Sequence, residues 1–131
     1  MQRLMEMVHE FMTAAGQRIG KEPGDVTEHN AELGLSLIAE EHNELVNACC
    51  QEGEESLVDI ADALGDLLYV TTWTALAFGF PMVEIMEEIQ RANMAKFGPG
   101  STKREDGKQL KPPDWKPPNI EQFIFPERFE Q

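Results

Sequence analysis

The stretch from Ser56 to Phe78 constrains the fold more than any other part of the chain. It contains no proline, and its apolar residues occupy most of the circumference of a helix rather than a single stripe. Such a helix is stable in water only when other elements cover it. The sequence therefore predicts a central, buried helix that begins at Ser56 or a neighbouring glutamate and ends at Gly79.

Three further segments repeat their apolar residues at intervals of three and four, which predicts amphipathic helices. They are residues 1–15, 31–50 and 82–97, the last preceded by Pro81 and followed by Gly98. Short connections between four helices favour a bundle. We therefore expect an all-α fold in which residues 1–98 form a four-helix bundle-like core.

After Gly98 the composition changes to glycine, proline and lysine, which predicts an extended tail over residues 99–131. Its large apolar residues are expected to pack on the bundle or on a partner subunit. They are Trp115, Phe123, Ile124, Phe125 and Phe129. A bundle this small is also expected to complete its core against a second copy, so we predict a homodimer or homotetramer.

The overall charge excludes several classes of partner. A formal net charge of −13 disfavours binding to nucleic acid or to an anionic membrane surface. The sequence has no apolar leader and no apolar run of membrane-spanning length. Its two cysteines, Cys49 and Cys50, are adjacent, and a disulfide between them would be strained. We expect a cytoplasmic protein without nucleic-acid or membrane partners.

Two groups of carboxylates are candidates for a functional site. Glu40, Glu41 and Glu44 fall three or four residues apart on one predicted helix, and Asp59, Asp62 and Asp66 do so on the next. A charged stripe is often only a solvated surface, and for the glutamates that interpretation is about as good as a functional one. The aspartates are different, because aspartate disfavours a helix interior and these three lie among apolar residues. A positive ligand would offset their repulsion.

The short turn at Gly53 predicts that these two helices are antiparallel neighbours, so the two acidic stripes can face each other. Five or six carboxylates without histidine or thiolate suit Mg²⁺, or alternatively Mn²⁺, rather than zinc. Mg²⁺ commonly completes its coordination shell with water and phosphate oxygens. The cluster therefore indicates a phosphorylated ligand.

The order of these motifs resembles that of a known superfamily, the all-α nucleoside triphosphate pyrophosphohydrolases, which includes MazG-like, dimeric dUTPase-like and phosphoribosyl-ATP pyrophosphohydrolase-like enzymes. The similar segments are Glu40-Glu41-x-x-Glu44, Asp59-Ile-Ala-Asp62, Ala63-Leu64-Gly65-Asp66, Asn93-Met94-Ala95-Lys96-Phe97 and Arg104-Glu105-Asp106-Gly107-Lys108-x-x-Lys111. The second motif of the family usually begins with glutamate, whereas this chain has the shorter Asp59. In an alternative register Asp66 matches the final aspartate, but Ala63 then replaces the acidic residue before it.

The resemblance implies Mg²⁺-dependent hydrolysis of a (d)NTP to the (d)NMP and pyrophosphate, in a house-cleaning or dUTP-directed role. Phosphoribosyl-ATP is the alternative substrate. The helical domain, residues 1–98, would then be catalytic. The implied metal ligands are Glu41, Glu44, Asp59 and Asp62, with Asp66 as a further carboxylate that binds the metal or supports its ligands. Glu40 is expected to orient or deprotonate the attacking water.

Basic and amide side chains near the C-terminus are candidates for substrate binding. Asn93 and Lys96 lie three apart on one helical face, where both can reach one polyphosphate. The tail adds Lys103, Arg104, Lys108 and Lys111. These four are expected either to close over the β- and γ-phosphates or simply to solvate a loop, and the sequence does not separate the two.

Two other classes of protein compete with this interpretation. A di-iron carboxylate bundle needs a Glu-x-x-His motif on each of two helices. The chain has one, Glu6-x-x-His9, and none in the acidic cluster. A non-enzymatic helical dimerisation or regulatory module would instead use the acidic stripes as surface charge, and it predicts neither metal-dependent stabilisation nor pyrophosphate release.

Overall fold

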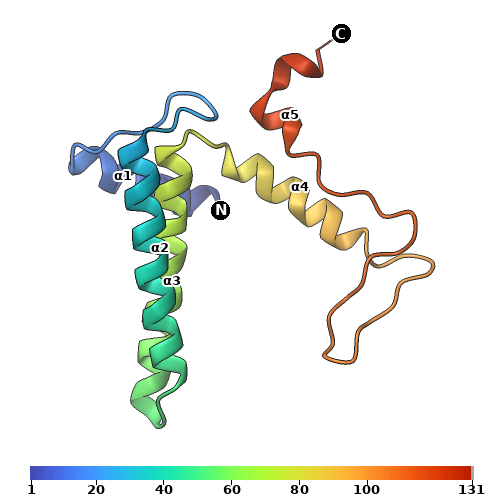
Figure 1. Ribbon diagram of the computed structural model, residues 1–131, viewed down its shortest axis with the longest axis horizontal. Helices are drawn as coiled ribbons and strands as arrows, with labels where there is room; N and C mark the ends of the chain where they lie inside the picture. The colour runs from blue at the N-terminus through green and yellow to red at the C-terminus, as the bar shows by residue number, and fades with distance from the viewer. Residues whose placement is uncertain (131) are drawn as a thin grey trace. The chain divides into compact units, whose positions relative to one another are not determined.

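The computed structural model describes residues 1–130, and within them it contains helices and no strand (Figure 1). The helices are α1 (Gln2–Ala14), α2 (Glu28–Cys49), α3 (Glu54–Ala77), α4 (Met82–Met94), α5 (Glu121–Ile124) and the short 3₁₀ helix η1 (Pro126–Arg128). The all-α prediction is confirmed. The chain divides into two compact units, Met1–Pro81 and a second unit that begins at Met82. The expected division at residue 98 stays a prediction.

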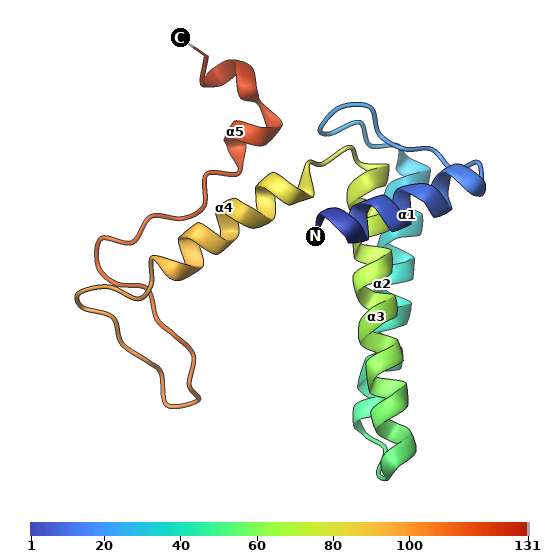
Figure 2. The ribbon, with the colours of Figure 1, turned by 180° about the vertical axis from the view of Figure 1, so that it is seen from behind.

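The first unit is built on an antiparallel pair of long helices, α2 and α3, which run side by side in both views (Figure 1, Figure 2). The turn between them ends at Gly53, whose φ of 102° lies in a region that residues with a Cβ rarely adopt. Gly34 lets the two helices approach closely, because a Cβ at this position would lie 2.8 Å from Thr74 Oγ1. The predicted pairing of these helices is therefore confirmed.

Helix α1 packs against the C-terminal half of α3 and closes the core of this unit. Val8 and Met12 of α1 are fully buried against Trp73 and Ala77 of α3. The indole N–H of Trp73 donates a hydrogen bond to Gln17 Oε1 at 2.9 Å, which satisfies the polar atom of this buried ring.

The N-terminal half of α3 is not buried in one copy of the chain, which differs from the prediction of a wholly covered helix. Leu57, Val58 and Leu64 are 66%, 70% and 47% exposed. In the first unit this half contacts α2, whereas the core residues of α1 lie at the other end of the helix.

Two helix boundaries also differ from expectation. Helix α2 begins at Glu28, because the Thr27 side chain accepts a hydrogen bond from the Asn30 N–H at 3.1 Å and caps the helix before the apolar periodicity starts. Helix α4 ends at Met94, three residues before Phe97. Within the described residues, no single helix has the length and apolarity of a membrane span, and α3 and α4 meet those criteria only when they are taken together.

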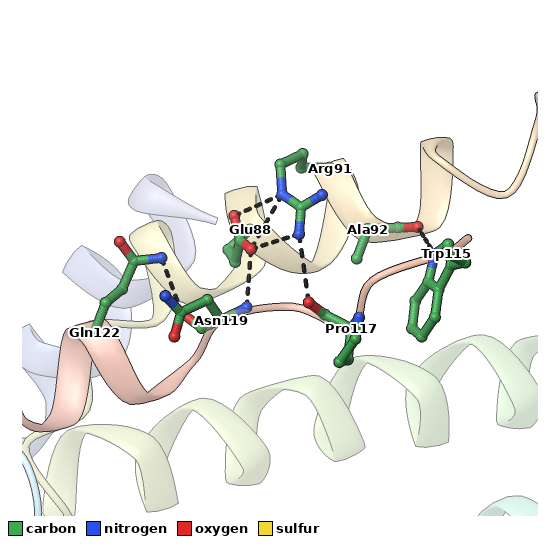
Figure 3. Close-up of polar contacts among 7 residues, drawn as sticks. All are labelled: Glu88, Arg91, Ala92, Trp115, Pro117, Asn119 and Gln122. Atoms are coloured by element: carbon green, nitrogen blue, oxygen red, sulfur yellow. Dashed lines mark hydrogen bonds and ion pairs between the residues drawn. The ribbon is translucent and has the colours of Figure 1, made fainter.

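The second unit consists of α4 and the tail, which returns along the helix (Figure 3). The Trp115 indole N–H donates to the Ala92 carbonyl at 2.6 Å. Glu88 accepts hydrogen bonds from both Arg91 and the Asn119 N–H, the latter at 2.9 Å. The tail is thus fixed to α4 by polar contacts and by Trp115, and it contains two short helical turns, α5 and η1, that its composition does not predict.

Candidate active site

Three carboxylates from α2 and α3 converge. Glu41, Glu44 and Asp66 each offer an oxygen atom, and these oxygens all lie within 4.8 Å of one another. The antiparallel turn explains which residues meet. Glu41 lies twelve residues before Gly53 and Asp66 lies thirteen after it, so the two reach about the same level of the helix pair.

Glu41 is the least solvated member of this cluster. It is half-buried, and its Oε2 atom is buried without any hydrogen-bond partner. Burial, followed by the negative charges of Glu44 and Asp66, raises the pKa of Glu41 above its ordinary value. A buried carboxylate oxygen facing two further acids is costly unless a proton or a cation shares the site.

The other two aspartates of α3 line a pocket next to the cluster. Asp59 and Asp62 border a hollow of about 210 Å³, together with Glu44 and Asn47 of α2. Glu44 takes part in both the cluster and the pocket, so the acidic surface is continuous along the helix pair. Asp62 lies nine residues after Gly53 and Glu44 nine before it, which places them at one level.

The structure therefore places the six predicted acids along one helix pair, but the acids that lie closest together are not the ones that the motif predicts. The tight group contains Asp66 with Glu41 and Glu44, whereas Asp59 and Asp62 lie beside it along the pocket. Glu40 is exposed, and its charge contributes to raising the pKa of Glu41. Spacing within one helix cannot distinguish these arrangements, because the register between helices decides them.

This donor set fits a hard divalent cation. The converging atoms are carboxylate oxygens, and the buried Glu41 Oε2 lacks the partner that a cation would supply. Among the described residues, none of the five ion pairs involves a member of the cluster. No basic side chain in these ion pairs therefore neutralises the negative charge of the cluster.

The predicted phosphate-binding residues all lie in the second unit, and only some of them come together. Lys96, Lys108 and Lys111 line a pocket of about 410 Å³ with Gln109 and Leu110. The Lys96 ammonium donates to Asn93 Oδ1 at 3.0 Å, so the predicted pair is formed.

The two remaining basic residues are used otherwise. The Arg104 guanidinium is bound by Asp106 within the loop, with Nε donating to Oδ1 at 2.9 Å. Lys103 pairs through its backbone with Gln109 in an isolated bridge. Neither residue lines the pocket.

Sequence reasoning assigned Trp115 to tail packing and missed its position beside the lysines. The Lys111 and Lys96 ammonium groups lie 4.8 and 5.7 Å from the centre of its ring. An aromatic residue within a lysine-rich tail is the signal that could have indicated such a cation–π contact.

Comparison with known families adds to this geometry. The sequence model of the family described as phosphoribosyl-ATP pyrophosphohydrolase matches residues 8–93. The chain belongs to this family. It is therefore a pyrophosphohydrolase of the MazG-like all-α superfamily, a hydrolase that acts on a nucleotide pyrophosphate bond. The matched region includes all six acids and Asn93, and it ends before Lys96 and the tail. A search of curated proteins finds no match.

Proposed function

We propose that this pyrophosphohydrolase cleaves a (d)NTP between its α- and β-phosphates with Mg²⁺, releasing the (d)NMP and pyrophosphate in a house-cleaning or dUTP-directed role; Mn²⁺ can replace Mg²⁺. The observation that carries the proposal is the convergence of Glu41, Glu44 and Asp66 within 4.8 Å. Carboxylate oxygens suit these ions, and both ions are commonly shared with substrate phosphates.

The proposal gives the acids distinct roles. Glu41, Glu44 and Asp62 hold the cation, together with Asp59, which lines the adjacent pocket, and Asp66 completes the close group at Glu41. Glu40, one residue before Glu41 and exposed, orients or deprotonates the attacking water. A bound Mg²⁺ would supply neutralisation of the charge that develops on the phosphate oxygens.

Basic groups of the second unit bind the substrate's phosphates in this proposal. Lys96, Lys108 and Lys111 border one pocket, and Asn93 holds the Lys96 ammonium in place. Lys103 and Arg104 do not line this pocket, and Arg104 would have to leave Asp106 before it could bind a phosphate.

Phosphoribosyl-ATP is the second candidate substrate. The matching family carries this substrate in its description, and the match spans residues 8–93. Its cleavage also releases pyrophosphate from a triphosphate chain, so the same acidic cluster serves either substrate. The two candidates differ only in the group attached to the α-phosphate side.

We propose further that the protein acts as a homodimer or homotetramer. Large apolar side chains on α2 and α3 are exposed in one copy: Leu35, Val46, Leu57, Val58, Leu64 and Leu68. Such a concentration of exposed aliphatic residues on one helix pair favours association with a second copy. Light scattering of the native chain and of Leu57→Glu tests this, with a lower mass expected for the variant.

The deciding experiment is a substrate panel. The native chain is incubated with Mg²⁺ and each (d)NTP or phosphoribosyl-ATP, and pyrophosphate and orthophosphate are measured separately. Pyrophosphate release by the native chain, and its loss in Glu41→Gln, are expected. Glu32→Gln is the matched control, because Glu32 is an exposed glutamate of the same helix outside the cluster. Orthophosphate as the sole inorganic product would refute the cleavage position.

A further inference from the structure

A further pocket of the first unit, the Asn30 pocket, lies where the start of α2 meets the loop that follows α1. It encloses about 310 Å³ and is lined by Gly16, Gln17, Arg18, Thr27, His29, Asn30, Leu33 and Trp73. None of the acids of the cluster and none of the proposed phosphate-binding residues belongs to this lining. The chemistry described so far therefore leaves the pocket without a role.

Asn30 is the most deeply buried polar residue of this lining. Its side chain is 6% exposed, and its Nδ2 atom is buried without a hydrogen-bond partner among the described residues. The cap of α2 does not use this group, because Thr27 accepts from the backbone N–H of Asn30. A buried donor without a partner costs free energy, and an acceptor supplied by a ligand in the pocket would remove that cost.

Two further polar groups of the lining are left as donors. Gln17 Oε1 accepts a hydrogen bond from the Trp73 indole at 2.9 Å, so the amide NH₂ group of Gln17 remains available for donation. The Thr27 hydroxyl oxygen accepts from the Asn30 N–H at 3.1 Å, so the hydroxyl proton also remains. The pocket therefore suits a ligand that presents several acceptors.

Charge and size narrow the ligand further. The guanidinium of Arg18 is bound by Asp25, with Nη2 donating to Oδ1 at 2.6 Å, and no carboxylate lines the pocket. The lining thus carries no fixed unpaired charge. Its volume of about 310 Å³ is at the lower end of the range of about 300–1,000 Å³ that is usual for ligand sites. An uncharged single ring fits these properties better than a phosphate group or a double ring.

The Asn30 pocket shares a face of the helix pair with the acidic cluster. Asn30 lies eleven residues before Glu41, which is close to three whole turns, and Trp73 lies seven residues after Asp66, which is close to two. At 1.5 Å per residue these separations correspond to about 10–16 Å along the helices. A nucleotide whose phosphates lie at the cluster can therefore extend its base into the pocket.

We propose that Asn30 is a specificity-determining residue, which selects a keto pyrimidine by donating from Nδ2 to the carbonyl oxygen at C4 of uracil or thymine. This oxygen lies at the edge of the base farthest from the sugar, so it reaches the most deeply buried donor. Cytosine carries an amine at the same position, which would place a donor against a donor. The inference rests on the proposed function and names its base, and it favours a dUTP-like substrate over phosphoribosyl-ATP, whose base is a purine.

The test uses nucleosides, because they contain the base without the phosphates that a metal ion would hold. Deoxyuridine and deoxycytidine are titrated separately into the isotope-labelled full chain in EDTA, and the amide signals are followed by NMR. Deoxyuridine should shift the side-chain amide signal of Asn30 and should bind about tenfold more tightly than deoxycytidine. Equal affinity for the two nucleosides, or binding of neither, would overturn the proposal.

Substitution of Asn30 removes the donor. Asn30→Leu keeps a similar volume and should lose about tenfold in affinity for deoxyuridine, so that both nucleosides bind equally. It should unfold at the native temperature or above, since no internal hydrogen bond of the Nδ2 atom is lost. Asn30→Ala should lose the same selectivity without filling the pocket. The matched control is Asn43→Leu, because Asn43 is an exposed asparagine of the same helix outside the lining. Selectivity retained in both Asn30 variants would contradict the assignment.

Turnover shows whether the ring in the pocket belongs to the substrate. With Mg²⁺, Asn30→Leu should raise KM for dUTP with little change in kcat and should bring kcat/KM for dUTP and dCTP close together. Deoxyuridine should compete with dUTP in the native chain. Inhibition that lowers kcat at constant KM would place an effector in the pocket and would refute its assignment to the substrate's base.

The nucleoside titration does not depend on hydrolysis, so the two proposals can fail separately. A native chain that binds deoxyuridine selectively but releases no pyrophosphate from any triphosphate refutes the proposed function and leaves the recognition by Asn30 intact. A native chain that hydrolyses dUTP and dCTP with equal kcat/KM refutes the selection by Asn30 and leaves the proposed function intact.

Discussion

The two units of the chain carry charge in different ways. Residues 1–81 contain fifteen acidic and three basic side chains, whereas residues 82–131 contain nine and eight. In the first unit the concentrated charge is the carboxylate group of α2 and α3, left without cationic partners among the described ion pairs. In the second unit it is the lysine pocket, lined by Lys96, Lys108 and Lys111, none of which forms an ion pair with the residues that the structure describes.

Charged side chains that form ion pairs within a unit can be distinguished from the unpaired groups that we propose bind ligands. Arg18 with Asp25 and Arg91 with Glu88 are close pairs within one unit, which fasten a loop and the tail. Exposed pairs of this kind contribute little stability individually, but they set local geometry. The carboxylate group and the lysine pocket instead have opposite signs in the two units, which is what the proposed binding of a cation and of the substrate's phosphates requires.

The largest effect is expected when a substitution removes one carboxylate of the cluster. Glu41→Gln should lower kcat/KM by about 10²–10³, since a neutral amide no longer supplies the anionic oxygen that holds the cation. Lys108→Gln should cost about tenfold and mainly in KM. A larger loss of kcat/KM in Lys108→Gln than in Glu41→Gln would contradict the proposal that the first unit holds the catalytic cation and the second unit binds phosphate.

Cation binding should stabilise the protein through the first unit. At free Mg²⁺ tenfold above its Kd, the free energy of unfolding should rise by about 1.4 kcal/mol. Thermal unfolding in Mg²⁺ and in EDTA measures this, and Glu41→Gln should show almost no rise while Glu32→Gln behaves as the native chain. A native chain that melts identically in both buffers would contradict the metal assignment.

The same measurement has a defined pH dependence. Burial and neighbouring charge raise the pKa of Glu41 above 4.5 in the folded chain. The metal-free folded state therefore holds this proton more tightly, and its stability should fall as pH rises from 4.5 through the raised pKa. The cation competes with the proton, so stabilisation by Mg²⁺ should grow over that same range.

In the second unit, the Glu88 carboxylate is one of the groups that hold the tail on α4. Hydrogen bonds from Arg91, and then from the Asn119 N–H, lower the pKa of Glu88 from 4.5 to about 2. The folded pKa is depressed, so the contribution of Glu88 is complete above pH 4.5 and is lost as pH falls towards 2. Glu88→Gln should increase hydrogen exchange at Asn119 at neutral pH, whereas Glu87→Gln, a change at the exposed neighbouring glutamate, should leave it unaltered.

Much of this arrangement is predictable from periodicity. The four long helices, the antiparallel turn at Gly53 and the acidic stripes follow from spacing, because apolar residues three and four apart define a helical face. What spacing cannot give is the register between helices. The sequence motif favours Asp59 and Asp62, whereas the structure brings Asp66 together with Glu41 and Glu44.

The second unit was harder to predict for a different reason. Its lysine pocket joins residues from the end of α4 and from a loop more than ten residues later, and polar backbone bonds close that loop. Backbone hydrogen bonds of this kind leave no periodic pattern of apolar residues in the sequence, so they cannot be predicted from periodicity. The sequence predicts a packing role for Trp115, and only the structure shows that the Lys96 and Lys111 ammonium groups lie beside its ring.

The smallest expected effect concerns a contact that involves no charged side chain. Thr27 caps α2 by accepting from the Asn30 N–H at 3.1 Å, so Thr27→Ala should lower the free energy of unfolding by about 1 kcal/mol. Thr27→Ser keeps the hydroxyl and should restore most of this loss, as chemical denaturation would show. An equal loss of stability in Thr27→Ala and Thr27→Ser would contradict the assignment of the Thr27 hydroxyl as the cap.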